Sequence, residues 1–238
     1  MPFRRWRHVF KLDPDRTLDD ARINRICESG TDAIIVGGSS GVNYDNTQQL
    51  LFDLRRYDLP CALEVSNLDA AVPGFDLYFV PIVLNTQDTR WLIGEHHHGI
   101  KRFGEWIPWE KVYAEGYIIL NEEAEAARVA NANTDLSVGD VIAYTRLADH
   151  IYRLPIIYIE YSGSYGNLDW VEQAAQVTDQ AHLFYGGGID GPDKAMRAAA
   201  VADTVIVGNA LYDQLDAALH TVAAVKSVKR TIQSRKAD

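Results

Sequence analysis

Two glycine-rich turns near the end of the chain contain the residues best suited to hold a phosphate group. Gly186, Gly187 and Gly188 follow one apolar run, and Gly208 and Asn209 follow the next. Glycine lets a backbone approach an anion closely, and a following helix adds free N–H groups and the positive end of its dipole. One glycine triplet alone would be explained as a tight turn. Two such turns after consecutive apolar runs favour a phosphate site.

A carboxylate lies at the end of the preceding apolar run. Glu160 closes residues 156–160 and is followed by Tyr161, Ser162 and Gly163. A carboxylate beside apolar residues costs free energy unless it is partnered or functional. Glu160 could orient or deprotonate a substrate hydroxyl, while Ser162 and Gly163 could add phosphate donors. The sequence leaves open an internal ion pair of Glu160, for instance with Lys11.

Three further polar residues follow the first two apolar runs. Lys11 is the last residue of the first run, and Asp13 lies two residues beyond it. Ser39 follows the second run after Gly37 and Gly38. Lys11 offers a point charge for phosphate. Asp13 and Ser39 are hard oxygen ligands of the kind that Mg²⁺ uses together with substrate phosphates and waters. Asp-Pro and Gly-Gly-Ser are also common in turns and loops, so this prediction depends on where the fold places them.

Two other groups of residues invite a functional interpretation. His96, His97 and His98 do not predict a metal site, because consecutive helical residues point about 100° apart. An aromatic-rich stretch surrounds the start of another apolar run: Trp106, Trp109, Tyr113 and Tyr117. Core packing is the ordinary interpretation of these aromatic residues, and a groove for an apolar ligand is the alternative.

The elements that must position these residues alternate along the chain. Short apolar runs typical of buried strands occur at residues 8–11, 33–36, 61–65, 77–80, 116–120, 156–160, 183–185 and 204–207. Amphipathic, helix-like segments occur at residues 18–28, 45–56, 90–103, 138–152, 168–178, 192–200 and 211–225, the first with Thr17 as its expected N-cap. Such alternation predicts an α/β fold, and eight strands favour a (β/α)₈ TIM barrel over an open sheet.

One unit of the predicted barrel is too short. Only residues 66–76 separate the third and fourth strands, and they include Pro73-Gly74, whereas a parallel crossover needs about a dozen residues or more. We therefore expect the third outer helix to be reduced or replaced by a loop. Residues 1–238 fit a single barrel domain, with residues 226–238 as a polar tail. The candidate residues would then meet at the C-terminal ends of the strands.

Composition limits the function classes. Hydrophobic residues make up 47% and charged residues 24%, as in a globular protein, and the net charge of −10 argues against a nucleic-acid binder. No apolar stretch approaches the roughly 18 residues of a membrane span, and no signal peptide is predicted. Cys27 and Cys61 have no metal or disulfide spacing, which predicts buried thiols in a reducing cytoplasm.

Across most of the chain, the sequence resembles the geranylgeranylglyceryl phosphate and heptaprenylglyceryl phosphate synthases. The matching stretches are residues 8–14, 28–33, 37–39, 63–66, 72–79, 114–117, 158–163, 184–189 and 207–209. The resemblance implies a modified barrel without a regular third helix. It also implies a Mg²⁺-dependent prenyltransferase that joins a polyprenyl diphosphate to the C3 hydroxyl of sn-glycerol 1-phosphate.

The resemblance also implies roles for individual residues. The glycerol phosphate would be held by Lys11, Tyr158, Ile159, Glu160, Tyr161, Ser162, Gly163, Gly188, Gly208 and Asn209. Asp13 and Ser39 would hold Mg²⁺, and Glu160 would orient the attacking hydroxyl. A homodimer is implied as well, and the lipid tail favours a transient contact with a membrane surface.

Gly99 occupies the position on the fourth outer helix where, by this resemblance, a bulky residue limits donor length. A glycine there favours a long donor, and we expect heptaprenyl (C35) diphosphate. Close helix packing is the simpler interpretation of Gly99. Three alternatives remain open at this point: a geranylgeranyl (C20) enzyme, a sugar-phosphate isomerase or cyclase, and a barrel that binds a lipid or phosphate without turnover.

Overall fold

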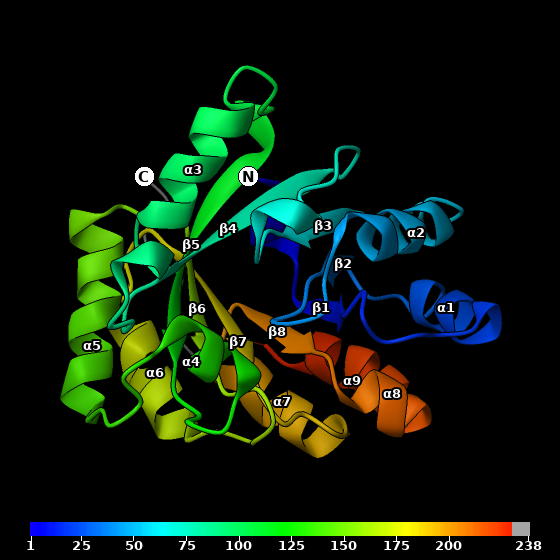
Figure 1. Ribbon diagram of the computed structural model, residues 1–238. Helices are drawn as coiled ribbons and strands as arrows, with labels where there is room; N and C mark the ends of the chain where they lie inside the picture. Colours follow the sequence, from blue (N-terminus) through cyan, green and yellow to red (C-terminus); the bar gives the residue numbers. More distant parts are fainter. Residues whose placement is uncertain (230–238) are drawn as a thin grey trace.

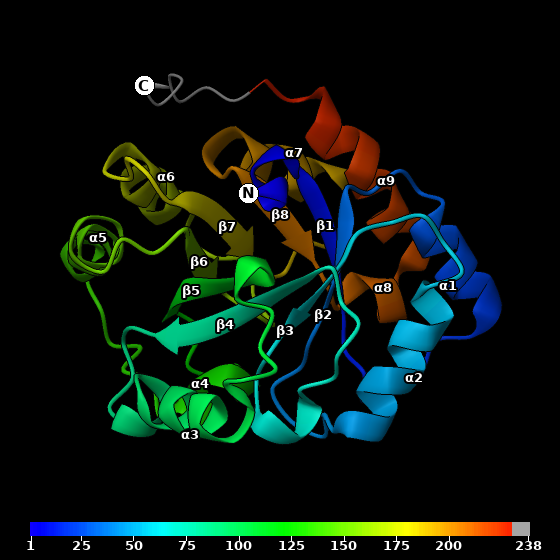
Figure 2. The same ribbon diagram turned by 90° about the horizontal axis from the view of Figure 1, so that it is seen from above.

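Eight parallel strands form a closed barrel in chain order, which confirms the predicted fold (Figures 1 and 2). The structure is a computed structural model and describes residues 1–229. The strands are β1 (His8–Leu12), β2 (Ala33–Val36), β3 (Cys61–Glu64), β4 (Leu77–Val83), β5 (Val112–Ile119), β6 (Ile156–Glu160), β7 (His182–Gly186) and β8 (Thr204–Val207). All eight predicted strands are present. β4 ends three residues later than predicted and β5 begins four residues earlier, because these two strands pair over six residues.

Helices surround the barrel (Figure 2). They are α1 (Asp20–Cys27), α2 (Tyr44–Leu54), α3 (Gly94–Phe103), α4 (Glu125–Ala130), α5 (Val138–Arg146), α6 (Leu168–Gln176), α7 (Pro192–Val201), α8 (Ala210–Asp213) and α9 (Leu215–Ser227). Within residues 1–229, no helix combines the length and the hydropathy needed to cross a membrane.

Several predicted helix boundaries were wrong. The N-cap of α1 is Asp19, whose carboxylate accepts a hydrogen bond from the Arg22 N–H at 2.8 Å, and not Thr17. The short helix α4 was not predicted. The predicted last helix is divided into α8 and α9, and the segment predicted at 138–152 leaves α-helical geometry after Arg146 for a π turn over Leu147–Ile151. These ends are set by local capping and by packing, which hydrophobic periodicity does not report.

The reduction of the third outer helix is confirmed. Only a single 3₁₀ turn, η2 (Leu68–Ala70), lies between β3 and β4. Asn67 caps this turn, because its side-chain oxygen accepts a hydrogen bond from the Ala70 N–H at 2.8 Å. The connection is too short for a helix, so the outer layer of helices is thin beside β3 and β4.

Each strand contributes to two separate cores. In β1, Phe10 and Leu12 point outward and pack under the helices, whereas Val9 points into the barrel. The interior is filled mainly by aromatic and β-branched side chains, such as Phe79 of β4 and Phe184 of β7, whose ring centroids lie 5.9 Å apart. The alternation follows from the period of two along a strand.

The end of the barrel where the strands begin is closed by the N-terminus. The 3₁₀ turn η1 (Pro2–Arg5) places Phe3 in the barrel, where its ring lies 5.0 Å from Tyr113 and 5.8 Å from Phe79. Trp6 packs against Phe79 as well, at 6.0 Å. Because this end is filled, a ligand can enter only from the other end.

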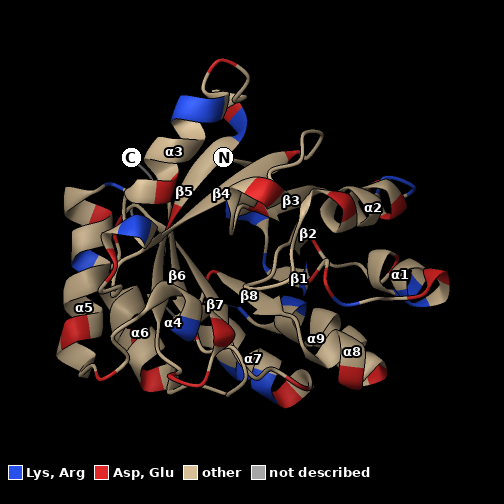
Figure 3. Cartoon of the chain, in the orientation of Figure 1, with Lys and Arg blue, Asp and Glu red and all other residues tan. Residues whose placement is uncertain are grey.

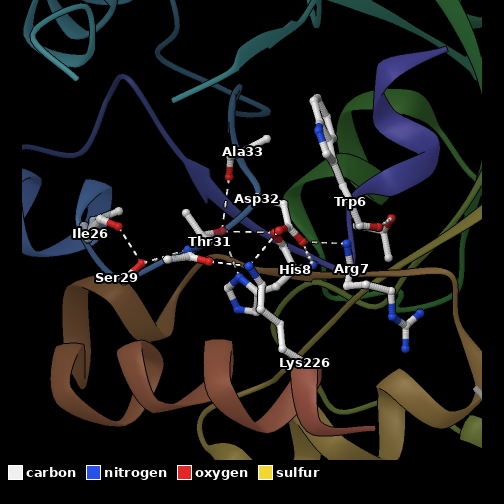
Figure 4. A network of polar contacts seen from close by, with 11 residues as sticks. Trp6, Arg7, His8, Ile26, Ser29, Thr31, Asp32, Ala33 and Lys226 are labelled. Atoms are coloured by element: carbon white, nitrogen blue, oxygen red, sulfur yellow. Dashed lines mark hydrogen bonds and ion pairs between the residues drawn. The ribbon is translucent and has the colours of Figure 1, made fainter. Parts of the chain in front are cut away.

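A polar network ties this closed end together (Figure 4). His8 is buried and contacts Thr31 Oγ1 and Thr221 Oγ1, each at 2.9 Å from one ring nitrogen. Asp32 accepts hydrogen bonds from the backbone of Arg7 and His8 and pairs with Lys226 Nζ at 2.7 Å. Lys226 and Ser227 end α9, so this helix extends two residues into the segment predicted as a polar tail. The remainder of that predicted tail, from residue 230 onward, lies outside the described residues.

Most charged side chains lie on the helices and loops outside the strands (Figure 3). Four charged side chains are placed differently, because they end or interrupt strands and point into the barrel: Lys11, Glu64, Glu115 and Glu160. The three glutamates are at most 5% exposed. Burying several carboxyl groups in one place is unfavourable unless they are paired or protonated, which marks this end of the barrel as the place for chemistry.

Candidate functional site

A charged cluster lies at the C-terminal end of the barrel. Lys11 Nζ of β1 forms an ion pair with Glu64 Oε1 of β3 at 2.7 Å. The Tyr117 hydroxyl of β5 lies 3.2 Å from Lys11 Nζ, 3.2 Å from Glu64 Oε2 and 3.3 Å from Glu160 Oε2 of β6. Four strands that are far apart in the sequence thus bring one amine, one hydroxyl and two carboxyl groups together.

Glu160 is held by its own strand and by the loop that follows it. Its Oε1 accepts a hydrogen bond from the Ser162 N–H at 2.6 Å, and the Tyr158 hydroxyl also bonds to the carboxylate. Burial raises the pKa of Glu160, while Lys11 and these two hydrogen bonds act in the opposite direction. A carboxylate with a raised pKa and a fixed orientation is suited to accept a proton from a hydroxyl group.

Lys11 is paired with Glu64, so the internal ion pair that the sequence left open exists, but with a different carboxylate. Burial lowers the pKa of Lys11, and the nearby Glu64 and Glu160 more than offset this, so that its pKa is raised and the amine stays charged. The amine contacts the Glu64 carboxylate and interacts electrostatically with Glu160. It can therefore support Glu160 electrostatically whether or not it also contacts a phosphate.

Sequence reasoning missed Glu64, Tyr117 and Glu115 as members of this cluster. Glu64 ends the apolar strand β3 in the same way that Glu160 ends β6, so the rule that identified one could have identified the other. Glu115 lies in the middle of β5, is fully buried, and has no hydrogen-bond partner for either carboxyl oxygen among the described residues. Burial raises the pKa of Glu115 well above its usual range, and Glu64 adds to the rise.

The loops after β6, β7 and β8 lie side by side, as predicted. The Tyr161 N–H donates to the Gly186 carbonyl at 2.7 Å. Gly188 has φ +50°, and a Cβ on it would collide with the backbone nitrogen of Tyr165, so only glycine fits here. A Cβ on Gly208 would lie 3.6 Å from the Lys11 carbonyl oxygen, which places the loop after β8 next to the end of β1.

These loops also provide hydrogen-bond donors. Among residues 1–229, the backbone N–H groups of Gly188, Gly208 and Asn209 donate to no protein acceptor. The Asn209 side chain accepts a hydrogen bond from Arg16 Nη1 at 3.2 Å, and so joins this loop to the one after β1. Unpaired N–H groups beside glycines form an anion-binding surface.

Asp13 and Ser39 lie on neighbouring loops at the same end. A Cβ on Gly38 would collide with the Asp13 carboxylate, so the backbone just before Ser39 passes directly over it. Asp13 Oδ1 accepts one hydrogen bond, from the Asp15 N–H at 3.0 Å. Within residues 1–229, no group of three or more His, Cys, Asp or Glu residues could hold a metal ion. One carboxylate and one hydroxyl fit Mg²⁺ only when phosphate oxygens and waters complete its shell.

An apolar groove of about 690 Å³ begins at this cluster. At one end it is lined by Gly38, Ser39, Glu64 and Tyr117, and farther along by η2, α3 and the outward-facing residues of β4: Tyr78, Val80 and Ile82. The groove therefore occupies the place left by the missing third helix. Trp106, Trp109 and Tyr117 line the groove, so the groove interpretation of the aromatic stretch is confirmed for these three residues. Tyr113 instead packs on Phe3, as the core interpretation predicted.

Gly99 faces this groove from α3. A Cβ on Gly99 would lie 2.8 Å from a δ-methyl group of Leu68 in η2, on the opposite wall. Both interpretations of this glycine therefore hold, because it packs closely against η2 and also lines the groove. The neighbouring histidines do not converge: His96 contacts the Pro81 carbonyl at 2.9 Å, and His97 and His98 are exposed.

Residues 1–226 of the chain match the PcrB family. The chain belongs to this family. It is 55% identical to the heptaprenylglyceryl phosphate synthase of Geobacillus kaustophilus (strain HTA426), over 94% of both chains. It is 53% identical to the enzyme of the same name from Brevibacillus brevis (strain 47 / JCM 6285 / NBRC 100599), over 95% of this chain and 98% of the relative.

Solved structures show the same barrel as this PcrB family member. The (S)-3-O-geranylgeranylglyceryl phosphate synthase of Thermoplasma acidophilum, in complex with sn-glycerol-1-phosphate, superposes with a TM-score of 0.84 at 23% identity, covering 95% of this chain and 97% of that one. A wild-type enzyme from Thermoplasma volcanium superposes with a TM-score of 0.83, also at 23% identity, over 94% of each chain. The likeness to these two structures establishes the fold.

Proposed function

We propose that this protein transfers a heptaprenyl group from its diphosphate to the C3 hydroxyl of sn-glycerol 1-phosphate, forming an ether and releasing diphosphate. The observation that carries the proposal is the position of the apolar groove, which is lined by Glu64 and Tyr117 of the buried charged cluster. A substrate with a long apolar tail and an acceptor with a phosphate would meet there. The names of the relatives at 55% and 53% identity support the same reaction.

Each part of the site has a role in this proposal. The glycerol phosphate lies against the free N–H groups of Gly188, Gly208 and Asn209, with residues 158–163 at the end of β6 beside it and the Lys11 amine nearby. Glu160 then orients the C3 hydroxyl and takes its proton as the oxygen attacks C1 of the donor. The enzyme's main contribution is to position the two substrates and to exclude water from the allylic carbon.

Asp13 and Ser39 are the proposed Mg²⁺ ligands, since they offer hard oxygens at the mouth of the groove. When bound there, Mg²⁺ supplies charge stabilisation for the departing diphosphate. Ser39 lines the groove and Asp13 lies beside it, so the diphosphate would be held at the groove's polar end while the tail extends away from it.

The tail would lie along η2 and α3, where contact with apolar walls is worth roughly 25 cal/mol for each Å² removed from water. Gly99 leaves this path open for a long donor. Trp106 and Trp109, which are 77% and 54% exposed, line the far part of the groove and support a transient contact with a membrane surface. We also propose that the protein acts as a homodimer in the cytoplasm, where the free thiols of Cys27 and Cys61 would stay reduced.

The test is to incubate the protein with Mg²⁺, prenyl diphosphates of graded length, and either sn-glycerol 1-phosphate or its 3-phosphate enantiomer. We expect an ether product from the 1-phosphate, formed fastest with the heptaprenyl donor. Fastest turnover of the geranylgeranyl donor would favour the C20 enzyme instead. No ether from any pair of substrates would refute the transferase. Retention of a ligand without turnover would then indicate a binding protein. The apolar groove argues against a sugar-phosphate isomerase or cyclase, because such an enzyme has no apolar substrate to bind there.

A further inference from the structure

The hydroxyl of Tyr117 contacts three charged groups at similar distances. Lys11 Nζ and Glu64 Oε2 each lie 3.2 Å from it, and Glu160 Oε2 lies 3.3 Å from it. A tyrosine hydroxyl has one proton to donate and two lone pairs to accept with. Lys11 can only donate, so it uses one lone pair. The single O–H can then serve only one of the two carboxylates.

The contact with the second carboxylate therefore lacks a proton. It becomes a hydrogen bond only if that carboxyl group is itself protonated and donates to the remaining lone pair of Tyr117. The network has room for one extra proton, between Glu64 and Glu160. The proposed reaction releases one proton, because a hydroxyl becomes an ether oxygen.

The position of Glu64 on the groove favours it as the group through which that proton leaves. The titratable and charged groups facing Tyr117 are Lys11 from β1, Glu64 from β3, Glu115 from β5, and Tyr158 and Glu160 from β6. Neither carboxyl oxygen of Glu115 has a hydrogen-bond partner among residues 1–229, so Glu115 is not part of the hydrogen-bonded network. Tyr158 donates to Glu160. Glu64 lines the groove, whereas Glu160 is enclosed by the Ser162 N–H and the Tyr158 hydroxyl. A proton on Glu64 can leave to water once the product has gone.

We propose that Tyr117 and Glu64 are positioning residues that receive, through Glu160, the proton of the acceptor hydroxyl. This inference rests on the proposed transferase function. The hydroxyl oxygen forms a bond to C1 of the donor, and the bond from C1 to the diphosphate oxygen breaks, with its electron pair leaving on the diphosphate. The hydroxyl proton passes to Glu160. Glu160 then protonates Tyr117 as Tyr117 gives its own proton to Glu64, so Glu160 is again a carboxylate and Glu64 is neutral.

The test compares Tyr117→Phe and Glu64→Gln with the wild-type protein in single-turnover reactions. Tyr117→Phe keeps the ring and removes only the hydroxyl, while Glu64→Gln keeps the shape and cannot take the proton. We expect each variant to lower the rate of ether formation by about tenfold, because the relay is one part of the acid–base contribution, and to change the KM for glycerol 1-phosphate by less than about twofold. Tyr113→Phe on the same strand is the matched control, because among residues 1–229 its hydroxyl contacts only the Glu110 carbonyl, at 3.4 Å.

Two readouts separate a relay from a structural role. In mixtures of H₂O and D₂O, a plot of the wild-type rate against the deuterium fraction should be curved, because more than one proton moves in the step. The same plot should be linear for both variants. The apparent pKa of the acidic limb of the pH–rate profile should rise in Tyr117→Phe, because Glu160 loses a hydrogen-bond donor. The same pKa should fall in Glu64→Gln, because Glu160 loses a neighbouring negative charge.

Full activity of Tyr117→Phe would overturn the relay while leaving the proposed transferase activity intact. The same conclusion would follow if the wild-type rate depended linearly on deuterium content and neither variant shifted the acidic limb of the pH–rate profile. Circular dichroism and thermal unfolding show whether each variant is folded, and Tyr117→Phe alone decides the question if Glu64→Gln unfolds. A wild-type protein that forms no ether would refute the transferase and the relay together, and that result is distinguishable because it appears before any substitution is made.

Discussion

Acid should destabilise this protein through His8, at the closed end of the barrel. Burial lowers the pKa of His8 from 6.5 to about 3; Asp32 opposes the shift and Lys226 adds to it. Both ring nitrogens contact threonine hydroxyls, from Thr31 and Thr221, so the neutral ring is fully partnered. His8 therefore stays neutral in the folded protein at pH values just below 6.5, where the same histidine binds a proton in the unfolded chain.

The size of the effect follows from linkage. Where the unfolded state binds one more proton than the folded state, stability falls by about 1.36 kcal/mol for each pH unit. From pH 6.5 to pH 5, His8 alone removes about 2 kcal/mol of the free energy of unfolding. The stabilisation is fully present above pH 6.5, and its loss stops near pH 3, where folded His8 also becomes charged.

The assay is urea unfolding at pH 7 and at pH 5, for the wild type and for His8→Gln. Glutamine can still donate and accept hydrogen bonds with the two threonines but does not titrate. The variant should be less stable at pH 7, and should lose about 2 kcal/mol less than the wild type on going to pH 5. Other titrating groups are common to both proteins and cancel. His98→Gln, at an exposed position on α3, should behave like the wild type. Equal losses in His8→Gln and in the wild type would refute the argument.

Three further predictions concern the proposed site. Gly99→Trp should fill the groove opposite Leu68 and shift the preferred donor from heptaprenyl towards geranylgeranyl, as measured by competition between the two diphosphates; an unchanged preference would remove Gly99 from the tail's path. Asp13→Ala should abolish Mg²⁺-dependent turnover with little change in the urea midpoint, and retained activity would exclude it as a ligand. Gly188→Ala should weaken glycerol phosphate binding by at least about tenfold in calorimetry, because the loop must move away from Tyr165; unchanged affinity would place the phosphate elsewhere.

The features that could be predicted from the sequence were those that depend on residues close together along the chain. Apolar runs separated by amphipathic segments identified all eight strands, and the short connection before Leu77 predicted the missing helix. The glycine turns were recognisable because a residue with a side chain would keep the backbone away from an anion at these positions. In a barrel these turns must meet at one end, so their position at the C-terminal ends of the strands followed from the fold without knowledge of any distance.

The partners inside the barrel could not be predicted in the same way. Lys11 was predicted to bind phosphate, and its pairing with Glu64, which is 53 residues away in the sequence, was not predicted. Which inward side chains share a layer depends on the stagger between strands, and a shift of one residue moves a side chain to the other face. Glu115 illustrates the limit further, because an unpaired buried carboxyl has no sequence pattern that distinguishes it from a solvent-exposed glutamate.

The missing helix and the charged cluster are connected by the topology of β3 and β4. In a regular barrel a helix would cover the outer face of these strands, and Tyr78, Val80 and Ile82 would be buried beneath it. Here the same side chains line the groove, while the inward residue Glu64 on the adjacent strand also reaches its end. The shortened connection therefore opens an apolar path directly onto the carboxylates. A protein that joins an apolar donor to a phosphorylated acceptor needs both environments side by side, and the omission of a helix provides this without disturbing the closed ring of strands.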